Sequence, residues 1–434
     1  MTLVTLLFFV LWPNFKLSRL LLQVFNLKVL LINKTKLLRY NLSMRSLFKN
    51  NPGIKHPWLR RFIIMIISGL LLLAAYFLGL NESSAEFWAR HIQRYWVYAF
   101  GHISSILPFS LFEILVLVAL LFTLIWLVLF FKKLFKGRFI KALNSLVDIV
   151  LVYALIIAIY AFVTGPSYKR APLNFPNYSE EISSDKVKTI ALAYIDNFNT
   201  VANDLERDSA GSAKLRLSLD ELHNLISEEY QKLNDDYFSS YSPKTKYLLN
   251  SWFLSEMQTT GISFSLTGEN HVNKLMPPVE IPFTLAHELA HSKGVMREDD
   301  ANLCALLVCL NSDNSFIKYS AYFRACPRLL SAVYYSCSKE DFEEVQASLS
   351  SLVLNEYANY DEYWEEHKFF SEFQDWLNDL YLKSQGISTG VDSYIDQEDA
   401  QESGTYYPDG SPVYVVTYSP MQQLLFSLYD QGEY

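Results

Sequence analysis

Three long apolar runs dominate the pattern of hydrophobic and polar positions in the first part of the chain. They lie at residues 62–80, 112–131 and 147–164. A helix rises about 1.5 Å per residue, so each run is about long enough to cross a hydrocarbon core of roughly 30 Å. Core helices of soluble proteins rarely stay so free of charge over this length. The pattern therefore predicts three transmembrane helices in a membrane region of residues 61–165.

Basic residues around these runs predict their orientation. Four of them precede the first run at residues 49–61, and five lie between the second and third runs at residues 132–141. The loop at residues 81–110 contains two arginines beside two glutamates. Short loops with an excess of positive charge lie on the cytoplasmic side of a membrane. We therefore expect the N-terminus and the second loop in the cytoplasm, and all residues after Thr164 outside it.

Two segments near these runs allow more than one interpretation. The loop at residues 81–110 contains five aromatic residues at positions 88–100. This composition favours either an amphipathic helix at the outer headgroup level or a helical hairpin packed on the spans. Residues 1–60 contain apolar stretches that are too short or too interrupted to span a bilayer. This N-terminal segment is interpreted as a signal-like segment, a membrane-surface helix, or sequence upstream of a true start at Met44.

The composition becomes that of a soluble domain from Tyr178 onward. Helical periodicity alternates there with turn signals, and Ser218 and Glu221 form a capping-box pattern. The predicted helices lie at residues 186–205, 219–233, 248–257 and 421–429, and the predicted strands at residues 261–266 and 413–417. The expected fold is mainly α, with a three-helix transmembrane region followed by an α+β domain that contains a small sheet. This extracytoplasmic domain is expected at residues 166–434.

The motif His287-Glu288-Leu289-Ala290-His291 lies in one of the predicted domain's apolar runs. On a helix, His287 and His291 project from the same face and can hold one metal ion. Glu288 can reach a water bound to that ion. Two ligands, a general base and an open metal position form the arrangement found in zincins. The alternative is a pair of surface histidines that flank a helix glutamate.

The residues after the motif supply a candidate third ligand. Gly294 can end the motif helix, because glycine takes a positive φ at no steric cost. A second helix is predicted to begin near Glu298, and a short turn would bring its start back to the metal. Glu298 is therefore the expected third ligand, with Asp299 as its substitute. Acidic residues are also favoured at a helix N-terminus by the helix dipole alone.

The same segments carry a resemblance to known families. Glu298-x-x-Ala301-Asn302 resembles the element that supplies the third zinc ligand in gluzincin peptidases. The metzincin pattern fails, because Arg297 stands where a third histidine is required. More of the chain resembles an uncharacterised bacterial membrane family, domain-of-unknown-function family 3810. The matching stretches are Pro108–Leu111, Tyr168–Leu173, Pro282–His291, Glu298–Asn302, Lys318–Tyr322 and Gly390–Tyr394.

This resemblance implies a zinc metallopeptidase of gluzincin type in the bacterial cytoplasmic membrane, with a zincin-like domain outside. His287, His291 and Glu298 would hold one Zn²⁺ whose bound water is activated by Glu288 as general base. The strand at residues 261–266 would line the cleft and pair with an extended substrate. The candidates for an oxyanion donor are Tyr394, Tyr319 and His271, and those for orienting the ligands are Asn302 and Asn273.

Composition and charge narrow the expected partners. The chain has a net charge of −8 and no basic stripe outside the membrane-flanking segments, so a nucleic-acid partner is not expected. A peptide or protein substrate and the lipid bilayer are expected, and the sequence predicts no oligomeric state. Two alternatives remain open: a zinc amidase that acts on cell-wall peptide, and a catalytically inactive membrane scaffold or sensor.

The four cysteines do not suggest a metal site of their own. None of them forms a C-x-x-C pair, which argues against a cysteine zinc site. An extracytoplasmic location permits disulfides, and Cys326 with Cys337 is one pairing left open. Buried free thiols are the main expectation.

Overall fold

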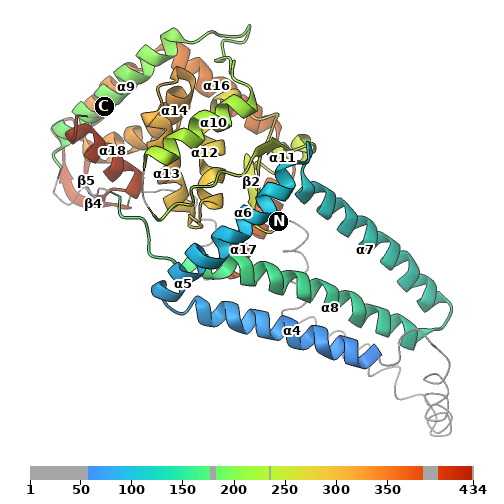
Figure 1. Ribbon diagram of the computed structural model, residues 1–434. Coiled ribbons are helices and arrows are strands. Elements are labelled where there is room, and N and C mark those ends of the chain that lie inside the picture. Colours follow the sequence, from blue (N-terminus) through green and yellow to red (C-terminus); the bar gives the residue numbers. More distant parts are fainter. Residues whose placement is uncertain (1–56, 176–181, 234–235, 385–398, 433–434) are drawn as a thin grey trace, which may run out of the picture. The chain divides into compact units, whose positions relative to one another are not determined.

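The computed structural model describes residues 57–175, 182–233, 236–384 and 399–432, and it is mainly helical with two small sheets (Figure 1). This confirms the predicted fold class. Contacts within the chain divide it into two compact units. One comprises Met1–Ala74 with Leu121–Phe162, and the other comprises Ala75–Leu120 with Val163–Tyr434. The interpretations of residues 1–56, including a start at Met44, lie outside the described residues.

Within the described residues, the first unit is built from three apolar helices. They are α4 (Pro57–Leu78), most of α7 (Leu111–Phe135) and α8 (Phe139–Thr164). All three are long and apolar enough to cross a membrane, as the hydrophobic runs predict. Within this unit the Arg61 guanidinium donates to the Asp148 carboxylate at 2.8 Å. This pair joins α4 to α8.

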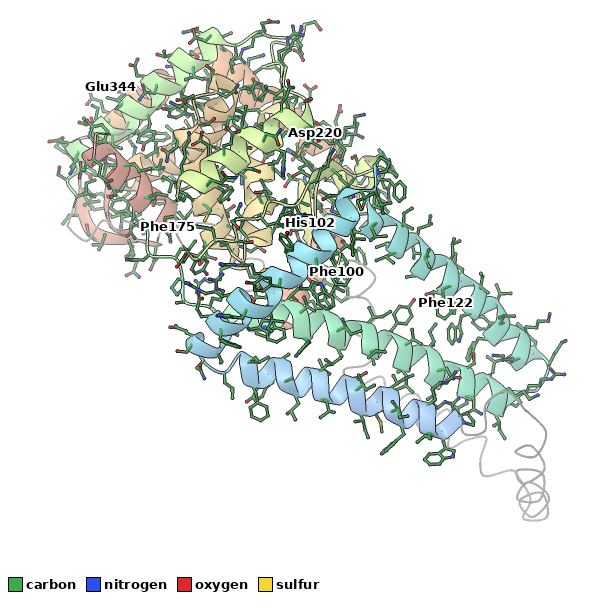
Figure 2. All side chains as sticks on the ribbon, in the orientation of Figure 1. Phe100, His102, Phe122, Phe175, Asp220 and Glu344 are labelled. Carbon is green, nitrogen blue, oxygen red and sulfur yellow. The ribbon has the colours of Figure 1, made fainter. Side chains whose placement is uncertain are left out.

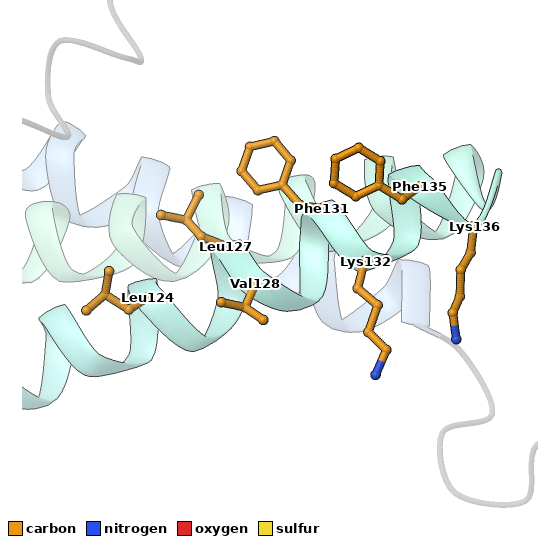
Figure 3. A pocket seen from close by; sticks show the side chains of 7 residues that line it. All are labelled: Leu124, Leu127, Val128, Phe131, Lys132, Phe135 and Lys136. Carbon is orange, nitrogen blue, oxygen red and sulfur yellow. The ribbon is translucent and has the colours of Figure 1, made fainter.

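The lateral surface of α7 is apolar along its length and ends in lysines. Figure 3 shows a hollow on this helix that is lined by Leu124, Leu127, Val128, Phe131, Phe135, Lys132 and Lys136. Six of the seven lining side chains come from α7 itself, and Lys136 follows directly after its last residue. This is the surface expected of a helix whose apolar part faces acyl chains and whose lysines reach the headgroups.

The loop at residues 81–110 is helical and belongs to the second unit. It forms α5 (Glu82–Trp88), a π-helical turn and α6 (Arg94–Ser105), whose Phe100 and His102 are labelled in Figure 2. Arg94 donates to the Asp236 carbonyl at 2.8 Å, and Trp96 donates to the Leu266 carbonyl at 3.3 Å. The loop thus packs on the domain, and it belongs to the stretch Ala75–Leu120 that clusters with the residues after Val163.

Most of the remaining helices of the second unit contribute residues to one hydrophobic core. Ser218 and Glu221 make both bonds of the predicted capping box at the start of α10. The helices predicted at residues 186–205 and 421–429 are also confirmed. The helix predicted at residues 248–257 is present but shorter. The helices are α9 (Ser184–Asp204), α10 (Leu219–Lys232), α11 (Ser251–Glu256), α12 (Ile281–Ser292), α13 (Glu298–Asn311), α14 (Ser315–Ser336), α15 (Lys339–Ala347), α16 (Ser351–Glu366), α17 (Ser371–Ser384) and α18 (Pro420–Asp430).

A three-stranded sheet packs against α12 and positions the candidate site. Its order is β1 (Thr245–Tyr247), β3 (Glu269–Val272) and β2 (Gly261–Phe264). β1 is parallel and β2 antiparallel to β3. Because β3 lies between the other two, β2 is an edge strand of this sheet. The predicted strand at residues 261–266 is therefore confirmed. A separate hairpin joins β4 (Asp399–Tyr406) to β5 (Pro412–Thr417), which contains the second predicted strand.

Candidate metal centre

The motif helix α12 has well-defined ends. It begins after a 3₁₀ turn and carries Pro282 in its first turn, where a missing N–H costs no hydrogen bond. At its other end Gly294 has a φ of +102° and its N–H donates to the His291 carbonyl at 3.1 Å. The chain then turns into α13, which begins at Glu298 as predicted and packs against α12. The turn therefore returns the start of α13 to the motif.

This turn brings the three predicted metal ligands together. Glu298 Oε2 lies 3.2 Å from His287 Nε2 and 3.5 Å from His291 Nε2. One candidate ligand atom from each residue lies within 4.8 Å of the others. Among the described residues, His287, His291 and Glu298 form the one such group of histidine, cysteine and acidic side chains. Asp299 points instead to Arg297, at 3.3 Å.

The spacing of these atoms fits a zinc ion. Zinc binds histidine nitrogen and carboxylate oxygen at about 2.0–2.1 Å with tetrahedral geometry, so two ligand atoms on one ion stand roughly 3.3 Å apart. The two Glu298 distances bracket that value. Two nitrogens and one carboxylate are also a ligand set that leaves a fourth position open in catalytic zinc sites. The residues present therefore fit a zinc ion.

The outer nitrogens of both histidines are held by hydrogen-bond acceptors. His287 Nδ1 lies 2.9 Å from Asn302 Oδ1, and His291 Nδ1 lies 2.7 Å from the Val295 carbonyl. Each acceptor places the proton on Nδ1 and leaves Nε2 free to bind a metal. Asn302 thus occupies the orienting position that the sequence predicts for it.

Burial and charge act against each other in this cluster. Burial disfavours the ionised form of Glu298, but the positive charges and hydrogen bonds of His291 and His287 outweigh it and lower its pKa to about 2. Burial also disfavours the imidazolium of His291, yet the Glu298 carboxylate raises its pKa to about 9. The side chains are 6–14% exposed, with His287 the most open. The cluster is therefore a charged centre with limited access to solvent.

Glu288 lies between this cluster and the edge strand β2. Burial raises the pKa of its carboxyl, and the backbone N–H of Ser263 in β2 donates to it. A Cβ atom on Gly261 would lie 2.6 Å from Glu288 Oε1 and 2.7 Å from the Thr284 methyl group. Glycine at this position therefore lets β2 approach α12 closely enough to hold Glu288.

Three other sequence candidates have their polar atoms engaged elsewhere in the domain. His271 is buried in β3, with Nε2 at 2.8 Å from Ser110 Oγ and Nδ1 at 3.2 Å from the Ile262 carbonyl. The Tyr319 hydroxyl donates to Glu356 at 3.2 Å. The Asn273 amide donates to Ser255 Oγ at 3.0 Å. No hydrogen bond joins these three to the ligand cluster within the described residues. Tyr394 lies outside the described residues.

Sequence reasoning missed two residues that support the site. The sequence places Gly261 in a strand but does not predict its close approach to Glu288. The available signal was a glycine at the start of a strand, which can mark a close approach of the backbone to a neighbour. Arg170 is buried and donates to the Gly294 carbonyl in the α12–α13 turn at 2.8 Å and to the Glu86 carboxylate at 2.7 Å. Its guanidinium also lies 3.5 Å from the centre of the Tyr237 ring. Its place in the matching stretch Tyr168–Leu173 was the available signal. All four cysteines are buried and free, as expected.

Comparison with known proteins gives one match. No curated protein and no solved structure matches the chain. Residues 88–397 match the family described as Protein of unknown function (DUF3810). The matched region contains α6, the three-stranded sheet and both helices of the candidate metal centre. The match covers well over half of the chain, and the chain therefore belongs to this family of unknown function, DUF3810.

Proposed function

We propose that this protein is a membrane-anchored zinc metallopeptidase that hydrolyses peptide bonds, with the catalytic domain on the extracytoplasmic face of the bacterial cytoplasmic membrane. One observation carries the proposal: a glutamate adjacent to the motif's first histidine lies beside a convergent His–His–Glu cluster. A purely structural metal site has no need of Glu288, whereas a hydrolase needs a base at that position.

His287, His291 and Glu298 would hold the zinc ion, which when bound acts as a Lewis acid and makes water a stronger acid near neutral pH. Asn302 and the Val295 carbonyl keep both imidazoles in the tautomer that binds metal. Glu288 accepts the proton of the attacking water and delivers it to the leaving amide nitrogen. A carboxyl with a pKa raised by burial is better matched to both transfers than an exposed one.

The edge strand β2 supplies a place for a peptide. Its outer edge is not paired within the three-stranded sheet, and its backbone reaches Glu288 through the Ser263 N–H. An extended peptide that added to this edge would lie next to the cluster and would be held by main-chain hydrogen bonds. This supports a peptide as the substrate.

The proposal is tested by hydrolysis of a peptide library by the full chain in detergent or vesicles, loaded with zinc. Glu288→Gln removes the base and keeps the side-chain shape. We expect it to retain the metal and lose activity about 10²–10⁴-fold, the usual contribution of a general base. Asp299→Asn is the matched control, because Asp299 contacts Arg297 and not the cluster. A parent that binds zinc and cleaves no peptide, but releases amino acids from cell-wall peptide, would favour the amidase. Activity that persists in Glu288→Gln would contradict the mechanism.

A further inference from the structure

A set of exposed apolar side chains lies in and beside α11 and α17 of the second unit and at Leu275, away from the candidate metal centre. Leu249 is 78% exposed, Trp252 is 58% exposed and Phe369 is 80% exposed. Isolated exposed apolar residues need no explanation, but contiguous ones mark a contact surface. We define the apolar rim by its members, which are Leu249, Trp252, Leu275, Phe369, Phe373 and Trp376.

Contacts within the unit show that these side chains come from adjacent elements. The Phe370 N–H donates to the Glu256 carbonyl at 2.8 Å, which joins the residues before α17 to the end of α11. The rings of Phe253 and Phe370 are 5.5 Å apart, and those of Phe373 and Trp376 are 5.9 Å apart. The Lys274 N–H donates to Ser251 Oγ at 2.9 Å, which brings Leu275 to the same helix. The segments that carry the apolar rim, which are separate in the sequence, therefore contact one another in the fold.

The start of α7 is fixed beside this patch. Glu113, in the first turn of α7, accepts hydrogen bonds from the N–H groups of Leu249 and Asn250, both at 3.0 Å. Glu269 in β3 accepts from the N–H groups of Leu111 and Phe112, both at 2.9 Å, and the Lys246 ammonium lies 2.6 Å from it. Hydrogen bonds at Glu113 and at Glu269 therefore hold the start of α7 next to Leu249, a member of the rim.

We propose that the apolar rim inserts into the interfacial region of the lipid bilayer that α7 enters, so that the domain lies against the membrane. The inference rests on the proposed crossing of the membrane by α7. The Leu249 N–H donates to Glu113, which lies in the first turn of α7, where the chain passes from the domain into this exposed apolar helix. Tryptophan and other aromatic side chains are favoured at the boundary between headgroups and acyl chains. The same bilayer thus continues from α7 onto the rim.

The test attaches a spin label to the full chain, reconstituted into vesicles of phosphatidylethanolamine and phosphatidylglycerol. It measures how often the label collides with oxygen, which concentrates in the bilayer, and with a water-soluble nickel chelate. Single cysteines replace Leu249 and Phe369 in the rim, and Leu124 in the middle of α7. Leu354→Cys in α16 is the matched control, since Leu354 is apolar and 50% exposed on the same unit. The four native cysteines are buried, so labelling goes to the introduced one.

We expect the labels at positions 249, 369 and 124 to collide more often with oxygen than with a water-soluble nickel chelate. The label at position 354 should show the reverse. Water-like collision rates at 249 and 369, with a lipid-like rate at 124, would overturn the rim and leave the membrane crossing intact. Protection of 249 and 369 from both agents would indicate a protein partner and would also overturn it. A water-like rate at 124 would overturn both the rim and the membrane crossing, whatever the outcome for peptidase activity.

Discussion

At the scale of single residues, the candidate site depends on side chains that hold other side chains in place. His287 and His291 were evident from their spacing, because two imidazoles four residues apart share one face of a helix. The acceptors that fix their tautomers were less evident, since Asn302 comes from the next helix and the Val295 carbonyl belongs to the backbone. Gly261 was recognised only as a strand residue, because a local pattern does not reveal which helix a strand will touch.

Asn302 is expected to support metal binding through His287. Asn302→Ala removes the acceptor of His287 Nδ1, so the imidazole loses its fixed tautomer and orientation. We predict a loss of zinc affinity of about 10–100-fold, the usual effect of removing such a partner. Competition with a chromogenic chelator measures it. Asn302→Asp keeps an oxygen acceptor and should bind zinc nearly as tightly as the parent. Equal affinities for Asn302→Ala and the parent would refute this role.

Gly261 is expected to matter for turnover rather than for metal binding. In Gly261→Ala the new methyl group would lie within 2.7 Å of Glu288 and Thr284, so Glu288 or the strand must shift. We predict a fall in kcat of at least about tenfold, because a displaced base transfers protons poorly. Zinc content should remain unchanged. Ser263→Ala is the control, because it keeps the backbone N–H that Glu288 accepts. A fully active Gly261→Ala would show that the close approach is unimportant.

At the scale of elements, the hydrophobic pattern predicted most helices and only some strands. Apolar runs and the capping box at α10 are local signals, and the structure contains those elements. β3 was missed because its four residues, Glu269–Val272, are all buried and mostly polar, so no alternation is visible. Its polar groups are satisfied by distant partners such as Ser110 and Lys246. The role of the 81–110 loop was also decided by tertiary contacts with the domain.

The link between α5 and the α12–α13 turn gives a prediction for pH. Burial disfavours the Glu86 carboxylate, but Arg170 and Arg90 outweigh it and lower its pKa from 4.5 to about 2. A carboxyl whose pKa is lower in the folded state stabilises the fold above its unfolded pKa. That stabilisation is lost as the pH falls from about 4.5 to about 2. Because Glu86 is only partly buried, with 28% of its side chain exposed, we expect roughly 1–2 kcal/mol after allowing for solvent screening.

Thermal unfolding of the full chain and of Glu86→Gln, measured between pH 7 and pH 2, checks this. The variant should have a lower Tm at pH 7, and the two curves should converge as the pH approaches 2. Glu82→Gln is the control on the same helix, because Glu82 is exposed. A difference that stays constant with pH would show that the Glu86 charge does not contribute.

At the scale of the whole molecule, the described residues combine three helices long and apolar enough to span a membrane with a domain in which His287, His291 and Glu298 converge. The sequence could predict this combination because hydropathy and the H-E-x-x-H motif are both local. It could not predict that residues 75–120 belong to the same compact unit as the domain, since that depends on contacts such as Arg94 with Asp236. Membership of DUF3810 extends the question of function to a whole family.

The orientation expected from basic residues is tested by cysteine labelling in intact bacterial cells that express the full chain. Leu354→Cys lies in α16 of the domain, and Lys136→Cys lies between α7 and α8. A membrane-impermeant maleimide should label position 354 in intact cells, and position 136 only after permeabilisation, because positively charged loops stay in the cytoplasm. The parent, whose cysteines are buried, supplies the background. The opposite labelling pattern would reverse the proposed topology.

The most direct measurement is a zinc titration of the metal-free full chain beside His291→Ala, Glu298→Gln and Asp299→Asn. We predict one zinc ion per chain for the parent and for Asp299→Asn. We expect the affinity for zinc to fall at least about 100-fold in His291→Ala and Glu298→Gln, since each loses a ligand from a three-residue site. A parent that binds no zinc, or a Glu298→Gln variant that binds it as tightly as the parent, would contradict the assignment of His287, His291 and Glu298 as the metal centre.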